Sequence, residues 1–472
     1  MNDISPKKTP LFRRQIPRTL LIGAGIVAGA VFLAFVGWRI WIRVEISQEV
    51  AAIRAEKLPA NWKELSKWID NVPDSENAAL IYLKAAGEIR GGNFLALKRY
   101  EKDAMPRSGP LSDEMRGVMV AIIKTNEAAL AEIYRAAQLP KSFYPVDYPR
   151  DYPGARAALE DHVFGLRDIG FLMAGEALFK TEEGDYDGAA KSISAGMTAA
   201  HSLDTSTSMQ MQYASFHMTA ILIESLQRVL NQGPVSEELL AKLGEQLTSE
   251  EKSQRFLTAM ICERARNNDL LEFGPRHMKQ FNAALRSEND DGGELIPSQW
   301  GMILRILGFF DRDRLFFLRA MKTNITIARM TPPASLAMSH VREEIGERAG
   351  NGLYIGSGMI LPEIALWPES DAEMHARLRT ASTAAGIERW RAMHDGKLPE
   401  SLAALVPSLL PEVPQDPFDG QPLRYKSLPR GYVVYSIGRD MKDDGGKEQP
   451  LRSAKIPLAE KNSFDITFVV ER

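Results

Sequence analysis

The chain has 472 residues, 44% of them apolar and 25% charged, which excludes a disordered protein and favours two or three folded domains. Its single cysteine, Cys262, excludes an internal disulfide and a zinc site built from several thiolates. The net charge is −3; residues 1–43 carry +6, so residues 44–472 carry −9 and lack the excess of cations with which proteins bind nucleic acid.

An uncharged apolar segment lies near the N-terminus. Residues 20–38 are long enough, as a helix, to cross the ~30 Å hydrocarbon core of a bilayer, and Trp38 and Trp41 stand at one end, where an interfacial aromatic belt would lie. Five basic residues precede the segment: Lys7, Lys8, Arg13, Arg14 and Arg18. The positive-inside rule therefore predicts a single-pass protein of the inner (cytoplasmic) membrane, with a cytoplasmic N-terminus and a periplasmic or otherwise extracytoplasmic C-terminal domain. The length of the segment favours an uncleaved anchor over a cleaved signal peptide.

Helical patterns then continue to about residue 367. Residues 44–57 are expected to prolong the membrane helix, and residues 61–70 place their apolar side chains on one helix face. Asp74 or Ser75 is the expected N-cap of a further helix. Residues 111–139 are predicted to form one long helix. Cys262 falls within a helical pattern and is predicted to be a small buried side chain.

A helical hairpin is predicted from Arg156 to Leu203. Residues 183–187 form its turn, and the second helix is rich in Ala, Gly and Ser. The pairing of large with small residues resembles a single tetratricopeptide-like unit, but no repeat at its period of ~34 residues follows. An ordinary antiparallel helix pair is the simpler interpretation.

Three further segments complete the helical region. The acidic residues 287–293 are interpreted as a solvated turn. Residues 303–330 are predicted to form one helix, whose four phenylalanines are expected to belong to the core. Residues 351–368, rich in Gly and broken by Pro, are predicted to form an irregular bridge.

The last hundred residues predict one helix packed on a small antiparallel sheet. The helix is expected from Asp371 to His394, with the Gly396 region ending it. Strands are expected at 423–426, 432–437 and 464–470, the first two joined as a hairpin. The whole chain is thus predicted to be mainly α, with a transmembrane helix, a hairpin- or solenoid-like helical body and a small C-terminal α+β domain. The expected divisions are a basic tail (1–18), an anchor (19–43), a helical ectodomain (44–367) and the α+β domain (368–472).

The order of turns in this tail resembles the globular head of the major pseudopilin of type II secretion systems. The matching points are Gly396 and Pro399, Asp416 to Phe418, Gly420, Tyr425, Ser436 to Asp440, Gly445-Gly446 and Asp465-Ile466. The chain lacks the pilin leader followed by Phe-Thr-Leu-x-Glu, and its apolar segment lies some 330 residues before the matched head. The resemblance therefore implies a pseudopilin-like module at the end of a helical protein.

Calcium is the cofactor that the resemblance implies. Major pseudopilins bind it after the Ser-x-Gly strand, which carries over to Asp440, Asp443 or Asp444, and Asp465. Carboxylates of this kind suit an ion that takes 6–8 oxygen ligands. The alternative is that these aspartates hydrogen-bond their own turns, as Asp does in Asx-turns.

Catalytic motifs are absent from the sequence: there is no Gly-x-Ser-x-Gly, His-Glu-x-x-His or P-loop pattern. The favoured function is a membrane-anchored extracytoplasmic scaffold or binding protein with protein partners, linked to secretion or envelope assembly. The alternatives are a calcium-dependent module that binds an envelope polymer, and an enzyme with an unrecognised site in the helical body. Neither a nucleic-acid partner nor a small-molecule substrate is indicated.

Overall fold

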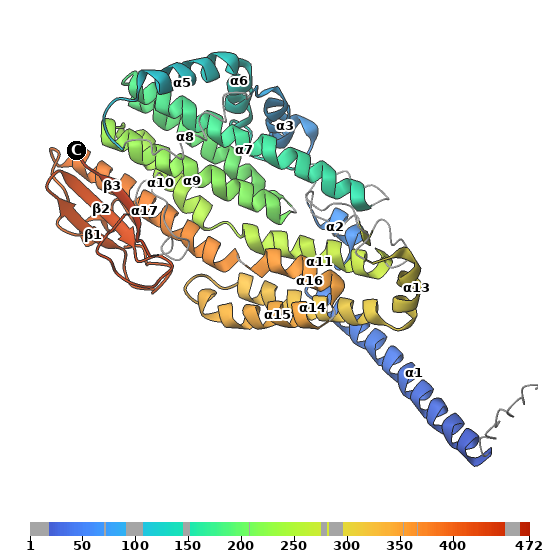
Figure 1. Ribbon diagram of the computed structural model, residues 1–472. Coiled ribbons are helices and arrows are strands. Elements are labelled where there is room, and N and C mark those ends of the chain that lie inside the picture. Colours follow the sequence, from blue (N-terminus) through green and yellow to red (C-terminus); the bar gives the residue numbers. More distant parts are fainter. Residues whose placement is uncertain are drawn as a thin grey trace, which may run out of the picture.

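The computed structural model confirms the predicted fold class: a mainly helical molecule, one long helix that projects from it, and a small antiparallel sheet near the C-terminus (Figure 1). The structure describes residues 18–69, 72–90, 107–144, 152–206, 208–274, 281–282, 296–352, 354–365, 367–448 and 463–472. The basic residues at 7, 8, 13 and 14 and the acidic turn at 287–293 lie outside these ranges.

The projecting helix is α1 (Arg18–Ala55). From Leu21 to Leu33 its apolar side chains are exposed, whereas Ile42, Ile46 and Ile53 are buried against the body. In the described part of the chain, α1 is the one helix that is long and apolar enough to cross a membrane. The expected continuation through residues 44–57 is confirmed to Ala55.

A layer of helices forms the half of the body that is far from α1 (Figure 1). The predicted hairpin is confirmed, and its small residues allow close packing: a Cβ on Gly196 would lie 2.8 Å from Leu222, and one on Gly170 would lie 2.6 Å from Met218. The elements of this layer are α3 (Ala78–Glu88), α5 (Asp113–Thr125), α6 (Glu127–Ala136), α7 (Tyr152–Glu182), α8 (Tyr186–His201) and α9 (Met209–Gln232).

Two sequence predictions for this layer are wrong. The predicted helix 111–139 is divided into two helices that meet at Asn126, whose backbone is not helical. The amide side chain of Asn126 forms hydrogen bonds with the backbone N–H and C=O of Arg90. Asp74 and Ser75 lie in a short 3-10 turn, and Asn77 caps α3 instead by accepting a hydrogen bond from the Ala79 N–H.

The second half of the body lies beside α1. Cys262 is fully buried here, as predicted. The predicted helix 303–330 is divided at Gly308, where a φ of +81° ends one helix and starts the next. The predicted irregular bridge is also wrong, because most of it forms a helix that contains Pro362. The elements of this half are α2 (Trp62–Trp68), α11 (Arg255–Phe273), α13 (Ser298–Ile306), α14 (Phe309–Ala328), α15 (Ser339–Asn351) and α16 (Ile355–Ala365). Helix α10 (Glu237–Glu251) lies in the other half, where it packs on α8 and α17 (Figure 1).

The tail matches its predicted elements closely. Helix α17 (Trp367–Met393) is followed by β1 (Arg424–Leu428), β2 (Gly431–Ser436) and β3 (Ile466–Val470), which form an antiparallel sheet in the order β1-β2-β3. The hairpin turn pairs Leu428 with Gly431. The hydrophobic core runs without a break from α3 through α7, α8 and α17 to β2 and β3. The sheet therefore packs onto the helical body as part of one core.

Candidate functional site

The first wall of the candidate site is formed by α1 where it packs on α14; we call this contact between the two helices the seam. The two helices run in the same direction, with Ile42 and Ile46 packed on Leu315 and Leu318. Salt bridges follow the seam along its length: Arg39 to Asp311 at 2.9 Å, Arg319 to Glu49 at 3.3 Å, and Arg329 to Glu56 at 2.7 Å. Apolar packing and charge together fix the angle at which α1 leaves the body.

The second wall is fixed by the buried carboxylate of Asp313 on α14. Its oxygens accept hydrogen bonds from the backbone N–H groups of Gly356 (2.7 Å) and Ser357 (3.1 Å) in the first turn of α16. A carboxylate satisfies the free N–H groups of a helix N-terminus and is favoured by the helix dipole. Burial raises the pKa of Asp313, and the hydrogen bonds from Ser357 and Gly356 oppose that rise. The contact holds Tyr354, just before α16, against α14.

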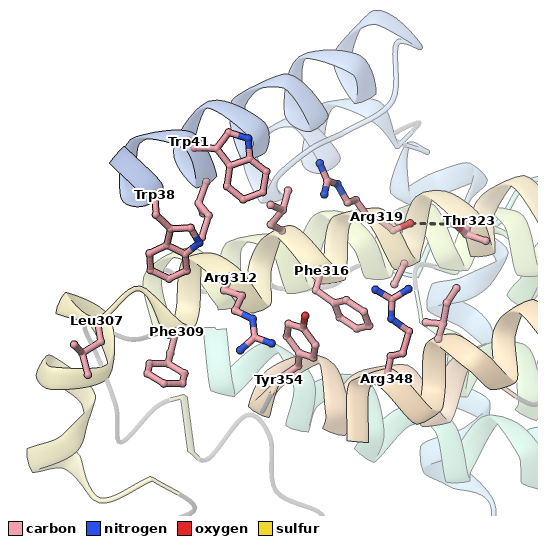
Figure 2. A pocket seen from close by; sticks show the side chains of 14 residues that line it. Trp38, Trp41, Leu307, Phe309, Arg312, Phe316, Arg319, Thr323, Arg348 and Tyr354 are labelled. Carbon is pink, nitrogen blue, oxygen red and sulfur yellow. Dashed lines mark hydrogen bonds between the residues drawn. The ribbon is translucent and has the colours of Figure 1, made fainter. Parts of the chain in front are cut away.

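Between these walls lies an open cleft of about 610 Å³, within the size range of small-ligand sites (~300–1,000 Å³). Figure 2 shows Trp38 and Trp41 of α1 above it, Arg312 and Phe316 of α14 in the middle, and Arg348 and Tyr354 below. Among the described residues, the lining contains no carboxylate. It consists of Trp38, Trp41, Ile42, Leu307, Phe309, Arg312, Leu315, Phe316, Arg319, Ala320, Thr323, Ile345, Arg348 and Tyr354, which we call the arginine–aromatic cleft.

The cleft carries an excess of positive charge. Arg319 is paired with Glu45 and Glu49. The side chains of Arg312 and Arg348, by contrast, form no salt bridge with any carboxylate in the described ranges of the chain. Arg312 instead lies over the ring of Tyr354, 4.5 Å from its centroid, and that ring stacks on Phe316 at 4.1 Å. Two guanidinium groups thus face a largely apolar space without an anionic partner, an arrangement suited to an anion that carries an apolar portion.

The sequence prediction does not include this site. It assigned the phenylalanines of residues 303–330 to the core; Phe310 and Phe317 are buried there, but Phe309 and Phe316 line the cleft. The lining residues of α1 lie about 270 to 310 residues before the others, so no local motif marks the cleft. The sequence feature that could have indicated the cleft is the presence of Arg312, Phe316 and Arg319 on one helix, together with the tryptophans that end the apolar segment.

The four predicted calcium ligands lie in the β2–β3 connection. Asp440 accepts a hydrogen bond from the Lys442 N–H at 3.1 Å, and Asp443 accepts one from the Gly445 N–H at 2.9 Å. Both are Asx-turn contacts, the alternative that the sequence left open. The carboxylate of Asp443 also lies 3.7 Å from Arg424.

Asp465 is the buried member of the set and organises the loop. It accepts hydrogen bonds from the N–H groups of Asp444 (3.4 Å), Gly446 (2.6 Å) and Lys447 (3.2 Å). Burial, together with the nearby charge of Asp443, raises the pKa of Asp465 against these hydrogen bonds. The structure brings Asp443, Asp444 and Asp465 into one loop, while the side chain of Asp440 is occupied by its own turn. Residues 449–462 of the connection lie outside the described ranges, and calcium binding stays a prediction.

A different group has the spacing of metal ligands. The Nδ1 atom of His201 lies 3.0 Å from Asp204 and 2.9 Å from Glu250, and Arg255 lies 2.5 Å from Glu250. Hydrogen bonds to Asp204 and Glu250 raise the pKa of His201 to about 10. Burial opposes ionisation of Glu250, but the charges of Arg255 and His201 lower its pKa. Because cations already neutralise these carboxylates, the group is an ion network that joins α8, α10 and α11.

Comparison of the chain with protein-family models, curated proteins and solved structures finds no match.

Proposed function

We propose that the protein is a single-pass, membrane-anchored extracytoplasmic binding protein whose arginine–aromatic cleft holds an anionic phospholipid at the membrane surface. The observation that carries the proposal is the pair Arg312 and Arg348, which line an apolar cleft beside the end of the apolar helix and have no carboxylate partner among the residues that the structure describes.

The position of the cleft along α1 supports a site at the bilayer surface. The uncharged apolar portion of α1 ends at Trp38, before Arg39, and Trp41 follows within one turn. If this portion crosses the membrane, these tryptophans lie in the headgroup region, where such side chains concentrate. They are also lining residues of the cleft, so its opening lies at the same level.

The chemistry of the lining favours a phospholipid over other occupants. Guanidinium groups bind phosphate through paired N–H donors, and the aromatic and aliphatic side chains fit the glycerol and upper acyl region. An acidic segment of a membrane protein is the alternative occupant. The lack of a carboxylate in the cleft supports binding over acid–base catalysis.

The wider role proposed for the chain is that of a scaffold linked to secretion or envelope assembly. The continuous core that joins the hairpin layer and α17 to the sheet supports it, because partner contacts on the tail would be held at a fixed position on the helical body. The pseudopilin-like identity of the tail and its protein partners belong to the same proposal.

Titration of short-chain phosphatidylglycerol into the full chain, held in phosphatidylcholine nanodiscs, tests the lipid site by calorimetry. We expect saturable binding, weakened about tenfold by Arg312→Gln or Arg348→Gln, because one solvent-accessible charged hydrogen bond contributes about 1.5 kcal/mol. Arg430→Gln, at an exposed turn of the tail, is the matched control and is expected to bind normally. Equal binding of short-chain phosphatidylcholine, or unchanged binding by both cleft variants, would contradict the proposal. Displacement of the lipid by a peptide from an acidic membrane segment would favour the alternative occupant.

A further inference from the structure

Helix α13 and Leu307, the residue that follows it, expose an apolar surface; Leu307 also lines the arginine–aromatic cleft, whereas the α13 residues do not. Trp300, Met302, Ile303, Ile306 and Leu307 are 52%, 71%, 45%, 62% and 44% exposed. Single exposed apolar residues are ordinary on protein surfaces, but five within eight positions form a patch of the kind that marks a contact surface.

The opposite face of the same helix is attached to the body. Gly301 is buried, and Leu304 packs on the core that contains Phe310 and Phe317. The helix is therefore held in place by one side and presents the other to its surroundings. This division is the amphipathic pattern of a helix that lies at an interface.

The C-terminal end of α13 is fixed against α1 at Trp38 and Arg39, where the uncharged portion of α1 ends. The chain turns at Gly308 so closely that a Cβ there would lie 2.1 Å from Nη1 of Arg39 and 3.0 Å from the ring of Trp38. Asp311, one turn into α14, forms the salt bridge with Arg39 at 2.9 Å. In Figure 1, α13 lies at the end of the body from which α1 projects.

We infer that α13 is a second membrane contact, lying along the surface of the bilayer that α1 crosses, with its exposed apolar face in the headgroup–acyl boundary. Trp300 then shares the interfacial level with Trp38 and Trp41, and the exposed Arg305 reaches the phosphate layer. The two contacts, one spanning and one lying flat, fix the tilt of the body on the membrane. The inference rests on α1 crossing the membrane and is independent of any ligand in the cleft.

Fluorescence from a label at Met302→Cys, in the full chain reconstituted into phosphatidylcholine nanodiscs, tests this contact. The only natural thiol, Cys262, is buried, so the parent protein serves as the labelling control. Met441→Cys, 54% exposed on the tail, is the matched site away from the membrane. We expect blue-shifted emission at 302 and several-fold stronger quenching by lipids carrying a nitroxide high on the acyl chain than at 441. Ile306→Cys should behave like 302.

Water-like emission at both 302 and 306, equal to that at 441, would overturn the inference. Blue-shifted emission that lipid nitroxides do not quench, and that depends on the number of chains per nanodisc, would also overturn it, because a second copy of the chain would then cover the patch. Neutral lipid is used throughout, so failure of this test leaves the anionic-lipid site unaffected, and failure of the titration leaves α13 unaffected.

Discussion

Replacement of Asp416 by Asn is expected to destabilise the tail strongly, although the side chain keeps its shape. The carboxylate is fully buried. One oxygen accepts hydrogen bonds from the Phe418 N–H (2.9 Å) and the Ser436 hydroxyl (2.8 Å). The other accepts from the Ile437 N–H (2.9 Å) and Arg424 (2.5 Å). All four donors converge on one anion and join the Asp-Pro-Phe turn to the end of β2.

The magnitude follows from this count of donors. An amide places an NH₂ group where one carboxylate oxygen stood, so two of the four donors face another donor. A buried donor left without a partner costs about 1–3 kcal/mol. We therefore expect a loss of about 3 kcal/mol, which corresponds to an opening equilibrium for the tail roughly 100-fold larger.

Hydrogen exchange followed by mass spectrometry measures this opening directly. Peptides covering residues 414–440 should exchange roughly 100-fold faster in Asp416→Asn. Asp440→Asn is the matched control, because Asp440 accepts one hydrogen bond within its own turn and should change stability by less than about 1 kcal/mol. Equal exchange in the two variants would refute the view that Asp416 organises the tail.

Three further outcomes are expected. His201→Gln should lower the free energy of unfolding most below pH 6.5 and least near pH 10. A histidine whose pKa is raised in the folded state stabilises the fold at any pH below its pKa in the unfolded state, and this stabilisation is lost as the pH rises through its pKa in the folded state. The imidazole is 52% exposed, so we expect only about 1–2 kcal/mol, read from urea unfolding across that range; a pH-independent difference would refute it. Ile42→Ala should weaken the α1–α14 seam by about 2–4 kcal/mol and speed exchange of residues 42–55, while the exposed Ile40→Ala should not; equal exchange would contradict this. Millimolar calcium should raise the melting temperature of the wild type but not of Asp443→Asn, and an unchanged wild-type value would remove the calcium assignment.

Local sequence signals predicted the elements whose ends are marked by turn chemistry. The hairpin α7–α8 was predicted from the Glu183–Asp187 turn, and the β1–β2 hairpin from alternation on either side of Gly431. The break at Gly308 was not predicted, because one glycine within an apolar run is compatible with a helix. Its left-handed conformation is instead accompanied by close packing against Arg39 and Trp38 of a distant helix.

Long-range contacts explain the remaining differences. Helix α16 forms despite its glycines and Pro362, because Asp313 caps its N-terminus and Leu361 and Ile364 are buried. The arginine–aromatic cleft exists only where α1, α14 and the segment around Tyr354 meet. A single sequence shows none of these contacts. The aspartates of the tail, by contrast, can be named from the sequence, but the backbone N–H groups that they bind are fixed by the fold of the loop.

Native mass spectrometry of the full chain, released from nanodiscs that contain equal amounts of phosphatidylcholine and phosphatidylglycerol, tests the central claim most directly. We predict that the wild type retains phosphatidylglycerol in preference to phosphatidylcholine. The double variant Arg312→Gln/Arg348→Gln should lose that preference while keeping the same fold by circular dichroism. Retention of the two lipids in their bulk ratio by the wild type would contradict an anionic-lipid site in the arginine–aromatic cleft.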